Sequence, residues 1–304
     1  MKVDPSVNRP PEARRALIAV DLDQTLIFSA RLAPVGAPDA PAVRVVEQLD
    51  GCAAAVMTHR AWEQLAALAM DHDVVPVTTR TLDQLRRVEL PPRIRWCICA
   101  NGGRLVTNGE PDEEWERWAV RLAAAGAPLA DAEGVLATAD DTWVRVRRTA
   151  DQLFCYLVAH AADCIDAAWL AEADAWAATN GWTLSVQGRK VYLVPSGLSK
   201  AAAVRRLRAR LVQAEPAAPG RVLLAAGDSL LDAGMLLAAD AAVRPSHGEL
   251  QRRPEVVPGV EVVPGTGLSA GEAVLVWLTE EAAHRTAGPP TRGCRAVIHP
   301  RQHS

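Results

Sequence analysis

The sequence predicts an α/β fold in which a parallel sheet is interrupted by an inserted α+β domain. Near both ends of the chain, short apolar runs alternate with segments of helical periodicity, a pattern typical of buried parallel strands joined by crossover helices. The middle of the chain has a different order of elements, which indicates a second domain. With 304 residues, 49% of them hydrophobic, the chain can bury the cores of two domains.

The predicted core domain is discontinuous and covers residues 1–80 and 196–286. Its first strand is the apolar run 16–22, which ends in acidic residues and is followed by a helix over 60–70 and a strand over 74–78. The second part is expected to hold helices over 200–212, 230–238 and 270–283 and strands over 221–226, 241–244 and 260–263.

Residues 81–195 are expected to form the inserted α+β domain. Its expected strands are 95–99, 143–147, 153–158, 182–186 and 191–194, and its expected helices are 113–125 and 167–179. The segment 287–304 is rich in Gly, Pro, Arg and His and is expected to be a flexible tail.

Composition and charge exclude several function classes. The net charge is −3, so the chain lacks the basic field that gathers nucleic acid or anionic membrane. We expect a cytoplasmic protein, because the N-terminal stretch has no apolar signal region and no apolar run reaches 18 residues without a charge. The six cysteines form no CxxC pair, which disfavours a disulfide framework or a zinc site. Small molecules are therefore the expected partners, and the sequence indicates no oligomeric state.

Asp21 and Asp23 follow the first predicted strand, at the edge where open α/β sheets bind ligands. Two carboxylates separated by a single residue on a strand point to the same side, so different environments can give them different roles. Asp21 would attack phosphorus and Asp23 would transfer the proton. An aspartyl-phosphate formed in this way splits one difficult displacement into two easier ones.

Two further residues are predicted to bind phosphate. Thr78 is the first polar residue after the strand 74–77 and can donate a hydroxyl hydrogen bond. Lys200 lies where a loop opens a helix, and its charge there would add to a helix N-terminus that already favours anions. Lysine is disfavoured at that position on charge–dipole grounds and is rare in this chain, and both facts favour a functional role.

A third acidic segment follows the predicted strand 222–225. Asp228 and Asp232 can meet the Asp21 pair at the same sheet edge, which would give the oxygen-rich shell that Mg²⁺ prefers. The structural alternative is that Asp228 or Ser229 only caps the following helix.

These segments, in this order, resemble motifs I to IV of the haloacid dehalogenase (HAD) superfamily phosphatases. The resemblance implies a Rossmann-like parallel-sheet core, with an α/β cap inserted between motifs II and III as in the subgroup of sucrose-phosphate phosphatases and Cof-type sugar phosphatases. It implies roles for eight positions: Asp21 as nucleophile, Asp23 as general acid/base, Thr78 and Lys200 as phosphate binders, Thr25 and Ser229 as support, and Asp21, the Asp23 backbone carbonyl, Asp228 and Asp232 as magnesium ligands.

The sequence departs from that pattern at two positions on the rim of the site. Gln24 replaces the usual Gly of DxDGT, and Thr79 replaces the Gly of TGR. Neither change removes a catalytic group, so both bear on the substrate rather than on the chemistry. As substrate-contacting residues we predict Asn101, in an Asn-Gly turn that resembles the cap entrance of the subgroup, and Arg189 in the cap.

The predicted function is magnesium-dependent hydrolysis of a small phosphorylated metabolite, for which the cap type favours a sugar phosphate. A phosphomutase, a nucleotide or specialised-metabolite phosphatase, and a non-catalytic binding protein remain as alternatives. A dehalogenase would not need Asp23, since its leaving group takes no proton, and a P-type ATPase would need membrane spans that the sequence lacks.

Overall fold

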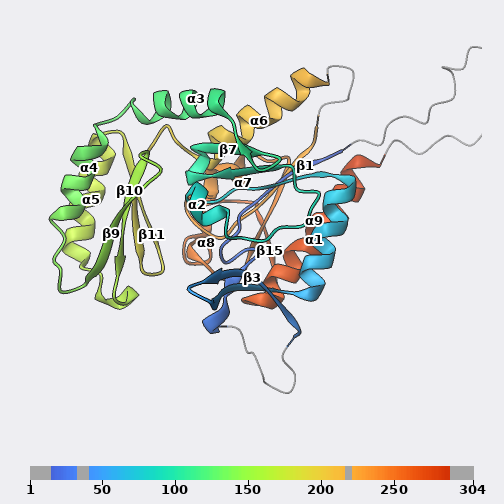
Figure 1. The fold of residues 1–304 in the computed structure, drawn as a ribbon, viewed down its shortest axis with the longest axis horizontal. Helices are drawn as coiled ribbons and strands as arrows, with labels where there is room; N and C mark the ends of the chain where they lie inside the picture. The colour runs from blue at the N-terminus through green and yellow to red at the C-terminus, as the bar shows by residue number, and fades with distance from the viewer. Residues whose placement is uncertain (1–14, 33–40, 216–220, 288–304) are drawn as a thin grey trace, which may run out of the picture.

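The computed structural model describes residues 15–32, 41–215 and 221–287 (Figure 1). All of the predicted tail except Ala287 lies outside these residues. Within the described part of the chain, no helix has the length and apolar character needed to cross a membrane.

The core is a parallel sheet of five strands, in the order β15-β14-β13-β1-β5. Its strands are β1 (Leu17–Val20), β5 (Asp73–Pro76), β13 (Leu223–Ala226), β14 (Ala241–Pro245) and β15 (Glu261–Val263). The central strand β1 pairs with β13 on one side and β5 on the other, and all four of its residues are buried. Burial on both faces explains why this strand is an unbroken apolar run rather than an alternating one.

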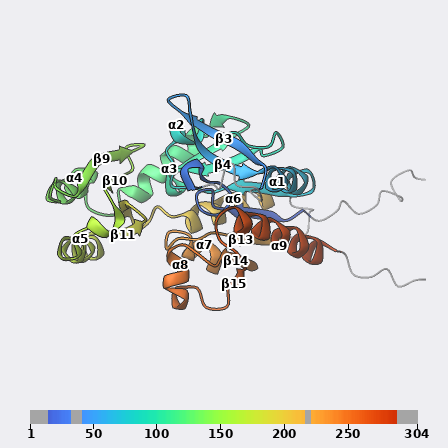
Figure 2. The same cartoon turned by 90° about the horizontal axis from the view of Figure 1, so that it is seen from below.

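Helices cover both faces of this sheet, which gives three layers (Figure 2). Ile18 and Val20 share a hydrophobic cluster with α1 (His59–Asp71) and α9 (Leu268–Thr286). Leu17 and Ala19 point the other way and pack with α6 (Lys200–Ala214) and α7 (Ala233–Leu237). The parallel sheet and helices expected from the sequence are therefore confirmed.

Two small antiparallel sheets pack on this core. Their strands are β2 (Phe28–Ser29), β3 (Val43–Leu49) and β4 (Cys52–Thr58) in one, and β6 (Trp96–Cys99), β7 (Arg104–Thr107) and β8 (Glu110–Pro111) in the other. Val77 and Ile98 form a parallel bridge, and Ile98 and Leu105 share the cluster that contains Leu17. Residues 96–111 therefore pack with the parallel sheet, although the sequence analysis assigned them to the inserted domain.

The inserted domain has a four-stranded antiparallel sheet in the order β11-β12-β10-β9, beside the core in Figure 1. Its elements are α4 (Leu129–Ala137), β9 (Val144–Ala150), β10 (Phe154–Ala159), α5 (Ala167–Thr179), β11 (Trp182–Gln187) and β12 (Lys190–Pro195). Both helices pack against the sheet, and the domain has its own hydrophobic cluster. We call this unit the cap.

The remaining described helices are short, apart from α3, which leads from the core into the cap. They are η1 (Ala30–Leu32), α2 (Leu82–Leu85), η2 (Ala100–Gly102), α3 (Glu113–Ala123), η3 (Ala162–Cys164), α8 (Glu249–Arg252) and η4 (Pro254–Val256). Trp115 of α3 is fully buried, and its indole Nε1 donates a hydrogen bond of 2.9 Å to the carbonyl of Gly102. This bond fixes the start of the connection between the two domains.

We expect Trp115→Phe to lower the free energy of unfolding by about 1–3 kcal/mol, because it leaves the Gly102 carbonyl buried without its donor. Urea denaturation measures this loss. Trp118→Phe is the matched control, since Trp118 is half-buried and its indole donates no hydrogen bond within the described residues. An equal loss in both variants would show that ring volume, not the hydrogen bond, matters here.

Candidate active site

The first acidic loop leaves the end of β1 and turns back at once. The amide of Asp21 donates to the carbonyl of Ala226 (2.9 Å), which continues the pairing of β1 with β13 past the strand end. The carbonyl of Leu22 accepts from the amides of Leu26 and Ile27, each at 2.9 Å. These bonds place Asp21, which is buried, beside the loop that follows β13.

Lys200 is the first residue of α6, whose N-cap is Ser199. The Lys200 side chain is only 1% exposed, and its Nζ lies 2.5 Å from Oδ1 of Asp21 and 2.6 Å from Oδ1 of Asp232. Burial alone would lower the pKa of Lys200, but the charges of Asp21 and Asp232 raise it above its ordinary value. The ammonium is therefore charged and bridges the two carboxylates.

Asp232 is engaged through both of its oxygens. While Oδ1 contacts Lys200, Oδ2 accepts from the amide and hydroxyl of Ser229 (2.9 and 2.7 Å) and from the amide of Asp228 (3.2 Å). Gly227 has no room for a side chain, since a Cβ there would lie 2.5 Å from Cγ of Asp232. Asp232 thus holds both Lys200 and the loop that carries Asp228.

The carboxylates of Asp21, Asp228 and Asp232 are all buried, and one oxygen of each lies within 4.8 Å of the other two. Burial raises the pKa of Asp21 to about 8, with Lys200 opposing and Asp232 adding to the shift. Burial and the charge of Asp21 raise the pKa of Asp228 well above its usual range. When all three carboxylates are ionised, the single ammonium leaves an excess of negative charge that a divalent cation would neutralise, and this hard oxygen donor set fits Mg²⁺.

Asp23 has a different environment, dominated by Arg80, which the sequence analysis did not select. Both oxygens of Asp23 accept from the Arg80 guanidinium at 2.8 Å, and the third guanidinium nitrogen contacts Oε2 of Glu47 at 2.9 Å. Burial alone would raise the pKa of Asp23, but the hydrogen bonds and charge of Arg80 lower it below its usual value. A signal was present, because Arg80 stands where the usual TGR segment has its arginine.

Thr78, which follows β5, and Thr25, in the turn between β1 and β2, are both buried. The amide of Thr78 donates to the carbonyl of Ile98 (2.9 Å), and its hydroxyl accepts from the amide of Arg80 (3.1 Å). The Thr25 hydroxyl has no hydrogen-bond partner among the described residues. The Thr78 hydroxyl keeps its proton available for a ligand, and the phosphate-binding role of Thr78 stays a prediction.

The cap turns polar side chains of β12 toward this site. Lys190 and Tyr192 lie two residues apart on β12, so they share a face of the sheet. Lys190 is exposed, and its pKa is raised by Tyr192 and by Asp23. Burial raises the pKa of Tyr192, while Lys190 and the Thr79 hydroxyl lower it. The cap therefore brings an ammonium and a phenol near Asp23, and the sequence analysis selected neither.

The two predicted substrate residues lie elsewhere. Asn101 is buried with φ of 53°, and its Nδ2 donates to the carbonyl of Leu198 (3.0 Å), so it ties the start of the insertion to the loop before α6. Arg189 is exposed in the turn before β12, and its guanidinium contacts the carbonyl of His160 (3.3 Å). Substrate contacts of either residue stay predictions.

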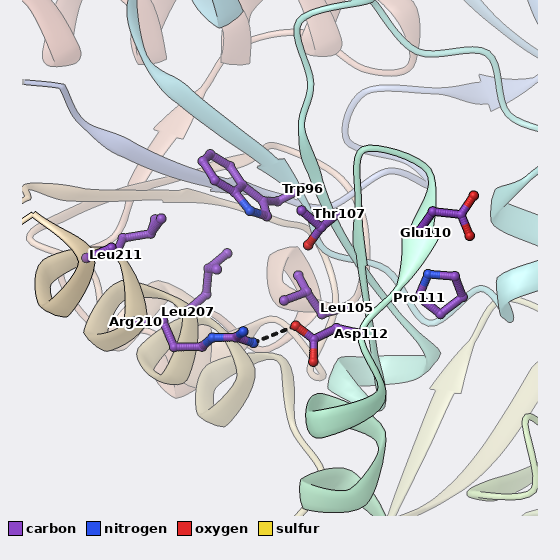
Figure 3. A pocket seen from close by; sticks show the side chains of 10 residues that line it. Trp96, Leu105, Thr107, Glu110, Pro111, Asp112, Leu207, Arg210 and Leu211 are labelled. Carbon is purple, nitrogen blue, oxygen red and sulfur yellow. Dashed lines mark hydrogen bonds and ion pairs between the residues drawn. The ribbon is translucent and has the colours of Figure 1, made fainter.

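A separate hollow of about 360 Å³ lies between β6, β7 and β8 and the C-terminal half of α6 (Figure 3). Its lining includes the ion pair between Arg210 and Asp112 (2.8 Å). Arg210 is ten residues beyond Lys200, which corresponds to about 15 Å along the helix. The hollow contains none of the residues of the acidic cluster and is not part of the candidate site.

Comparison with known proteins gives structural matches alone, since no family model and no curated sequence matches. The sucrose-phosphatase from Synechocystis sp. PCC6803, solved with sucrose and phosphate, superposes with a TM-score of 0.60 at 13% identity, covering 88% of this chain and 98% of that one. A HAD subclass IIB sugar phosphatase matches with a TM-score of 0.56 at 11% identity, covering 88% and 98%. A HAD phosphatase from Bacteroides thetaiotaomicron matches with a TM-score of 0.53 at 14% identity, covering 91% and 98%. The chain therefore has the fold of the HAD superfamily phosphatases of subclass IIB.

Proposed function

We propose that this protein hydrolyses phosphate monoesters with Asp21 as its nucleophile. The observation that carries the proposal is the buried Lys200 ammonium, which bridges Asp21 and Asp232 within a cluster of three carboxylates. A lysine in this position neutralises the repulsion between an attacking carboxylate and an anionic phosphate. The fold shared with HAD phosphatases supports the same chemistry.

The reaction divides into two displacements. In the first, a carboxylate oxygen of Asp21 bonds to phosphorus while the bond from phosphorus to the alcohol oxygen breaks, and Asp23 gives its proton to the departing alcohol. In the second, Asp23 takes a proton from water, whose oxygen bonds to phosphorus. The bond between Asp21 and phosphorus then breaks, and inorganic phosphate leaves.

The lowered pKa of Asp23 supports its proposed role as a base in the second displacement. Arg80 lowers the pKa of Asp23, so the free enzyme favours the carboxylate form, which suits the second displacement. The first displacement needs the protonated form. A phosphate dianion beside Asp23 favours protonation, because nearby negative charge raises the pKa of a carboxyl group. Substrate binding thus opposes the effect of Arg80.

Asp21 and Asp228, with the backbone carbonyl of Asp23, are the residues that would hold Mg²⁺. Both oxygens of Asp232 are already engaged by Lys200 and by the loop of Ser229, so we assign Asp232 an indirect role through those partners or a water. A bound Mg²⁺ would neutralise phosphate charge and align the ester.

For the substrate we propose a sugar phosphate. The matched sucrose-phosphatase was solved with sucrose and phosphate, and this chain shares its fold. In this protein, the cap face near Asp23 carries the ammonium of Lys190 and the phenol of Tyr192. The hydroxyl of Ser185 lies in the register opposite Tyr192, and it is buried beside the carboxylate of Glu249. Such donors and acceptors suit the hydroxyl groups of a sugar.

The first test is phosphate release from a panel of sugar phosphates, nucleotides and p-nitrophenyl phosphate, with Mg²⁺ or EDTA. We expect Asp21→Asn to lower kcat on the order of 10⁴-fold or more, as removal of a catalytic nucleophile or its partner does in other covalent catalysts. Asp174→Asn, on the exposed side of α5, is the matched control and should keep native activity. Equal turnover in native protein and Asp21→Asn would reject the nucleophile assignment, and a need for a sugar bisphosphate would indicate a mutase.

The raised pKa of Asp21 predicts a pH-dependent stability in the absence of metal. The folded state binds more protons than the unfolded chain between the ordinary pKa of 3.8 and about 8, so the contribution of this group to stability falls as pH rises through that window. We expect metal-free native protein to lose more stability from pH 6 to pH 8 than Asp21→Asn does. Mg²⁺ should stabilise native protein more at pH 8 than at pH 6, because binding requires the carboxylate.

Thermal unfolding of both proteins at the two pH values, in EDTA and in Mg²⁺, measures this difference. The lowered pKa of Asp23 and the raised pKa of Lys200 act below and above this window. Asp228, whose pKa is also raised, is present in both proteins, so the comparison reports Asp21 together with its effect on Asp228. A metal-free native protein that gains stability relative to Asp21→Asn between pH 6 and pH 8 would contradict the prediction.

Lys190 and Arg189 are adjacent in the chain, but their side chains have different partners, so the two residues form a matched pair for mutation. We expect Lys190→Ala to raise KM for the best substrate about tenfold or more, the typical loss for a hydrogen bond to a charged group. Arg189→Ala should change KM by less than about twofold, because its guanidinium contacts the His160 carbonyl at the cap surface. Steady-state kinetics decide between them, and a larger effect at Arg189 would favour the residue predicted from the sequence.

A further inference from the structure

Residues 246–250, which follow β14, contact both acidic loops of the site. On one side, Nε2 of His247 lies 2.7 Å from the carbonyl oxygen of Gln24, in the loop of Asp21 and Asp23. On the other side, the amide of Leu250 donates to the carbonyl of Asp228 (3.0 Å), and Oε2 of Glu249 accepts from the amide of Leu230 (3.1 Å). We call this five-residue stretch the brace.

The brace packs tightly against the loop of Asp228. Gly248 has φ of 83° and no room for a side chain, because a Cβ there would meet the backbone carbonyl of Asp228 at 2.6 Å. The carboxylate of Glu249 is buried, which raises its pKa, and the Leu230 amide is one of its partners. The position of the Asp228 loop is thus tied to the position of His247.

Gln24 is the strained point in the other loop. Its φ is 64°, in the left-handed region that non-glycine residues occupy only at a cost. The sequence places glutamine here, where glycine would be free of that cost. The hydrogen bond from His247 compensates, because rotation of the Gln24 peptide toward a relaxed conformation would carry its carbonyl away from the imidazole.

The His247 ring is held in one orientation. Because a carbonyl can only accept, Nε2 carries the proton of this hydrogen bond. The ring makes an edge-to-face contact with Phe28, with 6.0 Å between the ring centres. Nδ1 is buried and has no hydrogen-bond partner within the described ranges. The imidazole therefore serves as a fixed donor to the loop of Asp21.

We propose that His247 is a positioning residue that sets the spacing between the Asp21 loop and the Asp228 loop, and with it the affinity for a divalent cation. This inference rests on the proposed function for the identity of the cation. His247 lies outside the acidic cluster, and its positioning role depends on the presence of glutamine at position 24.

The test compares His247→Ala, His247→Gln and the same changes in a Gln24→Gly background, with His59→Ala at the exposed start of α1 as the control. Calorimetric titration with Mg²⁺ measures affinity without reference to turnover. We expect His247→Ala to weaken binding about tenfold, the lower end for residues that support metal ligands. His247→Gln, which keeps an N–H donor, should recover a large part of the loss.

The Gln24→Gly background makes the test specific. Glycine adopts a positive φ freely, so His247→Ala should weaken Mg²⁺ binding by less than about threefold there. kcat should follow affinity at low Mg²⁺, while KM for the ester at saturating Mg²⁺ should stay within about twofold of the native value, since His247 contacts no predicted substrate group. An equal loss in both backgrounds would overturn the proposal, as would native Mg²⁺ affinity in His247→Ala.

Hydrogen exchange separates this proposal from the proposed function. The amides of Leu26 and Ile27 close the Asp21 loop, so they should exchange faster in metal-free His247→Ala than in native protein, but not in the control. Suppose that native protein releases no phosphate from any ester, but the amides of Leu26 and Ile27 still exchange faster in His247→Ala than in native protein. The proposed function then fails and the positioning role stands. Unchanged exchange in His247→Ala would reject the positioning role even in an active enzyme.

Discussion

The buried ammonium of Lys200 is the constraint on which the rest of the site depends. An unpaired charge at 1% exposure would cost more than the fold can supply, so Lys200 requires carboxylates on both sides. One comes from the end of β1 and the other from the loop after β13. These strands are adjacent and parallel, so their carboxyl ends meet at one edge of the sheet. The helix that carries Lys200 begins where the chain returns from the cap.

The same edge holds two carboxylates with opposite electrostatic surroundings. Burial raises the pKa of Asp21 although Lys200 opposes the shift, while Arg80 contacts both oxygens of Asp23 and lowers its pKa. Two carboxyl groups two residues apart can have separate roles only if their environments differ in this way. Arg80 also contacts Glu47 of β3, so the hairpin of β3 and β4 takes part in setting the state of Asp23.

Hydrophobic periodicity in the sequence predicted the helices that bury one stripe of side chains and the strands that are buried on both faces. The helix expected over 167–179 has those bounds in α5, and the apolar run that ends at Asp21 is β1. The helix α4 (Leu129–Ala137) was not predicted, since its short sequence carries Gly134 and little periodicity. The hairpin of β3 and β4 was also not predicted. Its second strand contains three consecutive alanines, which have low strand propensity, so pairing with β3 and burial determine its conformation.

In the candidate site, the sequence indicated the residues that lie at or soon after the ends of core strands. It did not indicate the residues whose roles depend on contacts with distant parts of the chain. Asp21 and Asp228 lie just after adjacent core strands, and Asp232 follows in the loop before α7, so the sheet topology brings all three to one edge. Arg80, Lys190 and His247 acquire their roles from partners 57, 167 and 223 residues away in the chain, a separation that periodicity does not encode.

The pair Arg189 and Lys190 shows why a correct strand prediction still leaves the substrate residues open. Alternation along β12 groups Lys190 with Tyr192 on one face and Val191 with Leu193 on the other. The sequence therefore gives the grouping, but not which group faces the core. That choice depends on which face of the cap sheet packs against α4 and α5, and Val191 and Leu193 are the fully buried pair. Once the apolar pair covers the helices, Lys190 and Tyr192 are left to face the phosphate end of the core, and Arg189 stays in the turn beyond them.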